Sequence, residues 1–289
     1  MYTLENDQLI IEVAAKGAEI QRIYNKETSL EYLWSGDPAF WGKHAPALFP
    51  IVGTLKNGKY FYQNKEYTLG RHGFARDKDF TLENKAPETI TLKLQDDEET
   101  LAHFPFHFEL KISYTLEKNK VNVHYGITNT GNDVMFFSIG AHPAFRVPLT
   151  DDTKFEDYRL SFNEFENTAR YPLDDKGLLK EKPEIFFQRT DELKLKKPLF
   201  YGDALVFKTL QSTSITIESS KTPHGLTVDF KGFPFMGIWS AKDADFVCIE
   251  PWHGVADSEN SSGILQEKEG IIPLESGRYF GAQWSMDFF

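Results

Sequence analysis

Hydrophobic residues in this chain recur mainly at every second position. The clearest run consists of apolar side chains at alternate positions, namely Phe106, Phe108, Leu110, Ile112, Tyr114 and Leu116. After a polar turn at 117–120, the alternation resumes from Val121 to Ile127. A period of two places alternate side chains on opposite faces of a strand. The two runs therefore predict a long antiparallel hairpin with one face on a core.

Shorter alternating runs predict further strands at Ile90–Leu94, Ile215–Ile217 and Leu226–Phe230. Turn motifs separate such runs, at Lys56–Lys59, Asn129–Asn132 and Asp175–Gly177. No amphipathic pattern of three or more helical turns is evident, and the best helical candidates are short pieces at Asp191–Lys196 and Asp37–Gly42. Many strands without intervening helices predict an all-β fold, a large antiparallel β-sandwich of two sheets.

Residues 150–200 are more charged and less regular than the rest of the chain. Aromatic residues nevertheless punctuate this segment, at Phe155, Tyr158, Phe162, Phe165, Phe186 and Phe187. A linker would not carry so many aromatic side chains. We therefore expect one domain over residues 1–289, with decorated loops.

Composition narrows the class of protein. The chain has 289 residues, of which 40% are hydrophobic, which is enough for a large core and excludes a mainly disordered chain. With 43 acidic and 32 basic side chains, the net charge of −11 argues against a nucleic-acid or anionic-membrane partner. No apolar run reaches membrane-helix length, and the N-terminus lacks a signal-peptide pattern, so we expect a cytoplasmic protein. No heptads or interface motif indicate an oligomeric state.

Three segments place titratable residues where the strand pattern does not require them. The first is Arg71–Asp77, in which two arginines flank His72 and Gly73. Glycine permits close approach of a ligand to the backbone or an unusual φ, and arginine and histidine can donate several hydrogen bonds to hydroxyl or anionic groups. A solvated loop with surface ion pairs is the alternative for this segment.

The second segment, Ser138–Arg146, holds His142 among small and apolar residues. Pro143 follows it directly, so we expect the strand ladder to end there and a cleft to open beside the imidazole. The ordinary pKa of histidine suits general acid–base catalysis. A hydrogen-bonded core histidine is the alternative.

The third segment, Phe246–Gly254, predicts an apolar strand that ends in Glu250. A carboxyl group beside apolar and aromatic side chains has its pKa raised by desolvation, which suits an acid or a base. A solvent-exposed glutamate or one paired with an arginine is the alternative. Cys248 alternates with Glu250 and is interpreted as a buried packing residue; as the only cysteine, it excludes an intrachain disulfide and a cysteine-cluster metal site.

Other motifs give no support for metal or nucleotide chemistry. His103 and His107 have the i, i+4 spacing of a helical metal site, but Pro105 and the strand predicted from Phe106 separate the two rings. No dinucleotide-binding, P-loop or serine-hydrolase motif is present. We therefore expect neither a metal nor a cofactor.

Taken together, several motifs resemble the aldose 1-epimerase (galactose mutarotase) superfamily, closest to its LacX-like, mutarotase-related branch. They occur in the family's order over essentially the whole chain, at Leu9–Val13, Lys16–Ile20, Pro46–Gly53, His72–Arg76, Gly140–Phe145, Asp203–Phe207 and Cys248–Trp252. The resemblance implies a β-supersandwich and cofactor-free interconversion of the α and β anomers of an aldose.

The resemblance also implies roles for individual residues. His142 matches the family's general acid and Glu250 its general base. His72 matches a histidine that hydrogen-bonds the sugar, Asp203 an aspartate that contacts substrate hydroxyls, and Arg76 a binding residue of the phosphosugar branch. Galactose mutarotases carry an arginine in the segment aligned with 43–53, where this chain offers Lys43 and His44.

Mutarotation requires a base for the anomeric hydroxyl proton and an acid for the ring oxygen, and one carboxylate with one imidazole meets that need. A sugar could stack on Trp239, Trp252 or Phe145. If the hexose is phosphorylated, the candidate phosphate ligands are Lys43, Arg71 and Arg76. The alternatives are a noncatalytic sugar-binding or sensory protein and a glycoside hydrolase, although a hydrolase would need two carboxylates at the scissile bond.

Overall fold

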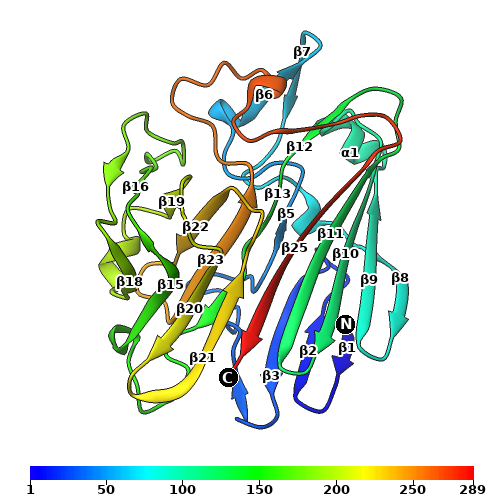
Figure 1. The fold of residues 1–289 in the computed structure, drawn as a ribbon. Helices are drawn as coiled ribbons and strands as arrows, with labels where there is room; N and C mark the ends of the chain where they lie inside the picture. The colour runs from blue at the N-terminus through cyan, green and yellow to red at the C-terminus, as the bar shows by residue number, and fades with distance from the viewer.

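The computed structural model describes all residues from 1 to 289, and antiparallel sheets dominate it (Figure 1). The largest sheet has nine strands in the order β18 (Thr190–Lys194), β15 (Tyr158–Glu166), β20 (Ser214–Ser219), β21 (Thr222–Asp229), β25 (Tyr279–Phe288), β11 (Lys120–Asn129), β10 (Phe108–Glu117), β9 (Thr89–Gln95) and β8 (Thr81–Ala86). This sheet spans the width of the molecule, from β18 at one edge to β8 at the other.

A second sheet has six strands, namely β19 (Leu205–Phe207), β22 (Phe235–Trp239), β23 (Phe246–His253), β13 (Ile139–Ala141), β5 (Ala47–Leu48) and β14 (Ala144–Arg146), the last paired with β23. A third has four, namely β1 (Tyr2–Glu5), β2 (Leu9–Val13), β3 (Ile20–Asn25) and β4 (Leu30–Glu31).

The remaining strands form two-stranded pairs: β6 (Lys59–Tyr62) with β7 (Lys65–Thr68), β12 (Met135–Phe137) with β24 (Ile272–Leu274), and β16 (Ala169–Arg170) with β17 (Glu184–Ile185). The helical elements are short, namely α1 (Glu98–His103) and the 3₁₀ turns η1 (Lys56–Gly58), η2 (Ala75–Asp77), η3 (Phe155–Asp157), η4 (Lys197–Phe200) and η5 (Leu265–Glu267). No helix is long and apolar enough to cross a membrane.

The predicted long hairpin is confirmed. Strands β10 and β11 pair antiparallel from Phe108 opposite Asn129 to Glu117 opposite Lys120, and buried residues alternate with half-buried ones along β10. The strand begins at Phe108 rather than at Phe106, because Pro105 has no N–H and the N–H of Phe106 bonds to the carbonyl of Phe104. The pleat turns one face of this hairpin into the core.

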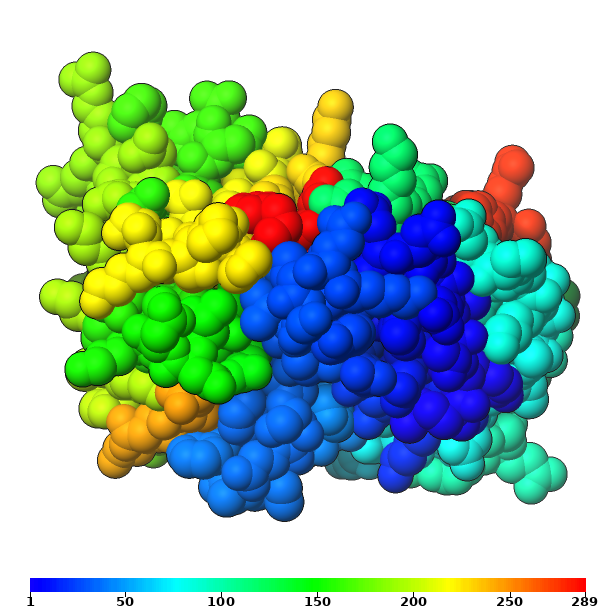
Figure 2. All heavy atoms as spheres, turned by 90° about the horizontal axis from the view of Figure 1, so that it is seen from below, coloured from blue at the N-terminus to red at the C-terminus, as the bar shows by residue number.

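One hydrophobic cluster of 64 buried residues joins the three larger sheets, with members such as Leu9 in β2, Ile112 in β10 and Ile249 in β23. The predicted β-sandwich is therefore confirmed, although its layers divide into more sheets than two. Seen from below, the N-terminal strands lie against the C-terminal end of the chain (Figure 2), where the Tyr32 hydroxyl donates to the carbonyl of Phe289 at 2.7 Å.

Both helical predictions are wrong. Residues Thr190–Lys194 form the edge strand β18, because pairing with β15 satisfies their backbone groups. Residues Asp37–Gly42 form a single turn, in which the amides of Phe40 and Trp41 both bond to the Asp37 carbonyl. The structure instead has α1, whose N-terminus is closed by a capping box between Asp97 and Thr100 that sequence reasoning missed.

The charged segment 150–200 contributes to the core as well as to loops. Phe155, Tyr158, Phe162 and Phe187 all belong to the main buried cluster, whereas Phe165 is exposed. Strand β15 carries this segment into the nine-stranded sheet between β18 and β20. Burial of these aromatic rings anchors the segment to the rest of the fold.

Candidate active site

A break in one strand ladder places His142 opposite Glu250. Strands β13 and β14 both pair with β23, with Gly140 opposite Trp252 and Ala144 opposite Cys248. In that register His142 lies across from Glu250, at the point where Pro143 removes a ladder hydrogen bond. Pro143 thus interrupts the ladder, which resumes in β14, rather than ending it. Glu250 lies inside β23 and not at its end as predicted.

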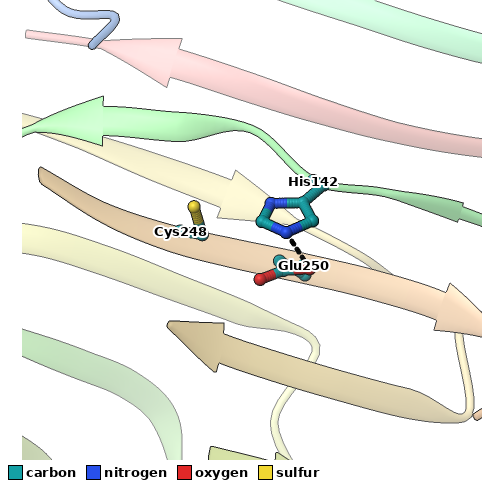
Figure 3. A group of neighbouring side chains, drawn as sticks. All are labelled: His142, Cys248 and Glu250. Carbon is teal, nitrogen blue, oxygen red and sulfur yellow. Dashed lines mark ion pairs between the residues drawn. The ribbon is translucent and has the colours of Figure 1, made fainter. Parts of the chain in front are cut away.

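The two side chains form a close buried pair (Figure 3). The His142 Nε2 atom lies 3.4 Å from Glu250 Oε2, with His142 only 7% and Glu250 only 1% exposed. Burial lowers the pKa of His142 to about 3, helped by the charges of two nearby arginines. Burial also raises the pKa of Glu250 well above its ordinary value. Both groups therefore favour their neutral forms, and the pair holds one transferable proton.

His72 lies beside this pair, with its ring edge-on to that of His142 at a centroid distance of 5.6 Å. The Gly53 amide donates to His72 Nδ1 at 3.1 Å, and Arg71 Nε lies 3.3 Å from His72 Nε2. A neutral imidazole has one acceptor nitrogen, so these contacts cannot both be hydrogen bonds of one tautomer. Because the Gly53 bond is shorter and buried, we assign the proton to Nε2. Burial lowers the pKa of His72 well below its ordinary value, which keeps the ring neutral.

The unusual φ predicted for Gly73 is confirmed, whereas the group that approaches it closely belongs to the protein and not to a ligand. Its φ of 71° and that of His72, 69°, belong to the left-handed region. A Cβ on Gly73 would lie 2.3 Å from the carbonyl oxygen of Phe49. The glycine therefore allows close approach of the protein's own backbone, which turns His72 toward the cavity.

Two guanidinium groups lie near these imidazoles. Arg71 binds Asp203 with both Nη atoms, each 3.3 Å from a different carboxylate oxygen. Arg76 Nη2 donates to the Arg71 carbonyl at 2.8 Å, and Arg76 Nε lies 3.6 Å from an oxygen of Asp77. The Ala204 amide donates to Asp203 Oδ1 at 2.7 Å, which fixes the carboxylate. Paired arginines next to a carboxylate can bind hydroxyl or anionic groups.

Tryptophans form the aromatic wall of the site. Trp41 stacks on His142 with ring centroids 4.7 Å apart, and Trp239 lies edge-on to Trp41 at 5.5 Å. Of the three rings predicted to stack on a sugar, Trp239 and Trp252 line the cavity, whereas Phe145 does not, because it is fully buried in the main core. Trp41 was missed, because its segment was interpreted as a possible helix.

These residues line one cavity of about 270 Å³. The structure brings together there all six predicted site residues, namely His72, Arg76, His142, Asp203, Trp239 and Glu250. Sequence reasoning missed apolar wall residues that carry no chemical signal, namely Leu173, Leu179, Val206 and Ala256. A cavity with apolar walls and a few convergent polar groups is typical of a small-molecule site.

Other candidates lie outside the cavity. Lys43 pairs with Asp77 at 3.0 Å, and His44 packs against Gly36. His253 lies between the rings of Phe233 and Phe280. The side chains of Lys43, His44 and His253 therefore do not line the cavity.

The residues that could hold a metal ion are His142, Cys248 and Glu250, which offer ligand atoms within 4.8 Å of one another. Cys248 is fully buried, and burial raises the pKa of its thiol, as expected for a packing residue. His103 and His107 are apart from this group: His103 ends α1, and His107 Nδ1 lies 2.7 Å from Asp96.

Comparisons with known proteins identify the family. The sequence profile of the aldose 1-epimerase family matches residues 1–269. The chain is 35% identical to the chromosomal LacX protein of Lactococcus lactis subsp. lactis, over 95% of this chain and 96% of LacX. A galactose mutarotase related enzyme from Lactobacillus acidophilus has a similar structure, with a TM-score of 0.95 and 37% identity over 100% of this chain and 97% of that one. A galactose mutarotase-like protein from Lactobacillus casei gives a TM-score of 0.94 and 31% identity, with both chains fully covered. This chain therefore belongs to the aldose 1-epimerase family.

Proposed function

We propose that this protein is a cofactor-independent mutarotase, an isomerase that interconverts the α and β anomers of a hexose such as galactose. The observation that carries the proposal is the buried acid–base pair, with His142 Nε2 3.4 Å from Glu250 Oε2 beside a cavity lined by tryptophans. Membership of the aldose 1-epimerase family supports it. Both the family and the tryptophan walls of the cavity favour a small sugar as the ligand.

The reaction needs two proton transfers and no other reactant. A base removes the proton of the O1 hydroxyl while an acid protonates the ring oxygen, and the bond from C1 to the ring oxygen breaks to give an open-chain aldehyde. Rotation about the C1–C2 bond then presents the other face of the carbonyl. Ring closure with the two roles reversed returns both protons and yields either anomer.

We assign Glu250 as the base for ring opening and His142 as the acid, which requires the carboxylate and imidazolium forms. Burial by itself favours the neutral forms. The two states differ only by the position of one proton, so changing one into the other alters no net charge. Sugar hydroxyls that donate to the carboxylate would favour the charged state. His142 Nδ1 and Glu250 Oε2 have no hydrogen-bond partner in the protein.

The remaining polar residues are suited to hold the sugar. His72, with its proton assigned to Nε2, can donate to a hydroxyl, and Asp203 can accept from one. Trp239 provides an apolar surface for a pyranose face, and Trp41 contributes a second. Together these groups would orient C1 and the ring oxygen toward His142 and Glu250.

A hexose 6-phosphate is a second candidate substrate, because Arg71 and Arg76 both line the cavity. Phosphate recognition commonly uses two or more cationic groups. Lys43, the third group predicted for this purpose, pairs with Asp77 and does not line the cavity. Arg71 already binds Asp203, so it would have to bind the phosphate and this carboxylate at the same time.

Anomer exchange measured by polarimetry or NMR tests the proposal. Galactose, glucose and their 6-phosphates would be compared at equal concentration, with buffer alone as the control. We expect exchange of at least one of them to be accelerated strongly over buffer. Saturable sugar binding without acceleration would instead identify a binding or sensory protein, and release of reducing ends from an oligosaccharide would identify a hydrolase.

A further inference from the structure

A buried ion pair lies directly behind the wall of the cavity. Lys268 Nζ donates to Asp257 Oδ1 at 2.8 Å and to the Val255 carbonyl at 2.7 Å. The two side chains are almost completely buried, with Asp257 5% and Lys268 6% exposed. Neither residue lines the cavity, and neither takes part in the proton transfers above. Burying two charges is costly, so a buried ion pair is weak evidence for a purely stabilising role.

Asp257 binds the segment Thr54–Lys56, which follows Gly53 in the chain, through both its backbone amide and its carboxylate. Its amide donates to the Thr54 carbonyl at 2.9 Å, and its Oδ2 accepts from the Lys56 amide at 2.9 Å. The preceding residue, Ala256, packs so closely on Gly53 that a Cβ on that glycine would lie 2.6 Å from the Ala256 Cβ. Asp257 therefore fixes the position of the Gly53 peptide.

The Gly53 peptide in turn holds His72. Its amide donates to His72 Nδ1 at 3.1 Å, and its carbonyl accepts from the His72 amide at 2.9 Å. The first of these bonds decides which ring nitrogen carries the proton. A shift of Gly53 would thus change both the position and the tautomer of a sugar-facing imidazole.

Asp257 also supports a second part of the apolar wall. Its carbonyl accepts from the Leu179 amide at 2.9 Å, and the Leu179 carbonyl accepts from the Glu259 amide at 3.1 Å. Leu179 lines the cavity. One residue therefore connects the wall that carries His72 with the wall that carries Leu179.

We propose that Asp257 and Lys268 are positioning residues of the sugar site, which set the His72 tautomer through Gly53 and hold the Leu179 wall in place. The Lys268 ammonium group binds both the Asp257 carboxylate and the Val255 carbonyl. It therefore holds the loop between β23 and η5 in one geometry. The role in sugar binding rests on the proposed function, but the role in the His72 tautomer does not.

Two variants test this proposal. Lys268→Met keeps the alkyl stem and removes the charge, but it leaves a lone buried carboxylate that can prevent folding. The double variant Asp257→Leu/Lys268→Met removes both charges and the oxygen that accepts from the Lys56 amide, and it fills the space with apolar side chains of similar volume. Lys197→Met is the matched control, since Lys197 Nζ also donates to a backbone carbonyl, that of Ala244, at 2.7 Å, but lies outside the cavity lining.

Three measurements separate positioning from mere stability. They are the ring ¹⁵N shifts of His72, assigned by their loss in His72→Asn; galactose titration followed by tryptophan fluorescence; and the melting temperature. For the folded variants we expect His72 to lose its single Nε2–H tautomer and the Kd of galactose to rise about tenfold. The control should change the melting temperature alone.

The proposal is overturned if a folded variant keeps the His72 shifts and sugar affinity of the parent protein, whatever its melting temperature. The proposal is also overturned if Lys197→Met changes the His72 shifts and the sugar affinity as much as the variants at Asp257 and Lys268 do. If the parent protein neither binds nor isomerises any sugar, the proposed function fails, and the His72 shifts still decide whether Asp257 and Lys268 position that ring.

Discussion

Trp41 lies stacked on the imidazole of His142, with ring centroids 4.7 Å and planes 24° apart. The indole covers one face of a ring whose pKa burial lowers to about 3. It also belongs to the cavity lining, so a bound sugar would contact it directly. Trp41 thus connects the solvation of the candidate acid with the shape of the cavity.

Removing this indole should expose His142. For Trp41→Ala we expect the pKa of His142 to rise toward the ordinary value near 6.5, because water would stabilise the imidazolium. Anomer exchange should fall by about tenfold or more, since a sugar-contacting surface is lost. NMR titration of the His142 ring measures the first effect and polarimetry the second. Trp41→Phe is the control, and it should retain most of the shielding; an unchanged His142 pKa in Trp41→Ala would contradict this explanation.

Glu250→Gln should abolish catalysis while the fold is retained. Glutamine has nearly the same shape but cannot accept and return a proton, and a positioned acid or base contributes about 10²–10⁴-fold to rate. The melting temperature should not fall substantially, because burial already disfavours the charged form of Glu250. NMR exchange of anomers and thermal unfolding measure the two effects. His142→Gln should behave similarly, and full activity in either variant would refute the roles assigned here.

Much of the fold could be predicted from local pattern, because alternation reports directly which face of a strand is buried. The hairpin of β10 and β11 shows this, since its turn and register follow from the run itself. The edge strand β18 could not be predicted, because its segment becomes a strand only by pairing with β15, and local composition favoured a helix.

The candidate site, too, could be predicted from the sequence only in part. His142 and Glu250 were predicted because each interrupts an apolar run, but their juxtaposition depends on the register between β13, β14 and β23, segments about a hundred residues apart. The ion pair of Arg71 with Asp203 joins residues 132 positions apart. Asp257 and Lys268 were missed because a charged residue in a loop gives no sequence signal that it is buried.

The effect of Arg76 on KM should distinguish a phosphorylated from a free sugar substrate. If a hexose 6-phosphate is the substrate, Arg76→Gln should raise its KM by about tenfold or more and change the KM of the free hexose little, because a charge-assisted contact to phosphate is lost. Lys43→Gln is the control, since Lys43 pairs with Asp77 outside the cavity, and should leave both KM values unchanged. Steady-state NMR exchange with both sugars measures this. Equal effects of Arg76→Gln on the two sugars would show that Arg76 binds a hydroxyl instead.

His253 should make the protein less stable in acid. Burial between aromatic rings lowers its pKa in the folded protein to about 4, whereas histidine in an unfolded chain titrates near 6.5. Between these two pH values the unfolded chain binds a proton that the folded protein does not, so stability is highest above pH 6.5 and falls as the pH drops toward 4. Urea unfolding at several pH values measures this slope, which for one proton is at most about 1.4 kcal/mol per pH unit. His253→Phe, which keeps an aromatic ring against Phe233 and Phe280, should make the slope shallower by up to the contribution of one proton, because His72 and His142, whose pKa burial also lowers, remain. His224→Phe at a half-buried position outside these rings should not change it. An equally steep slope in His253→Phe would assign the acid sensitivity to other groups.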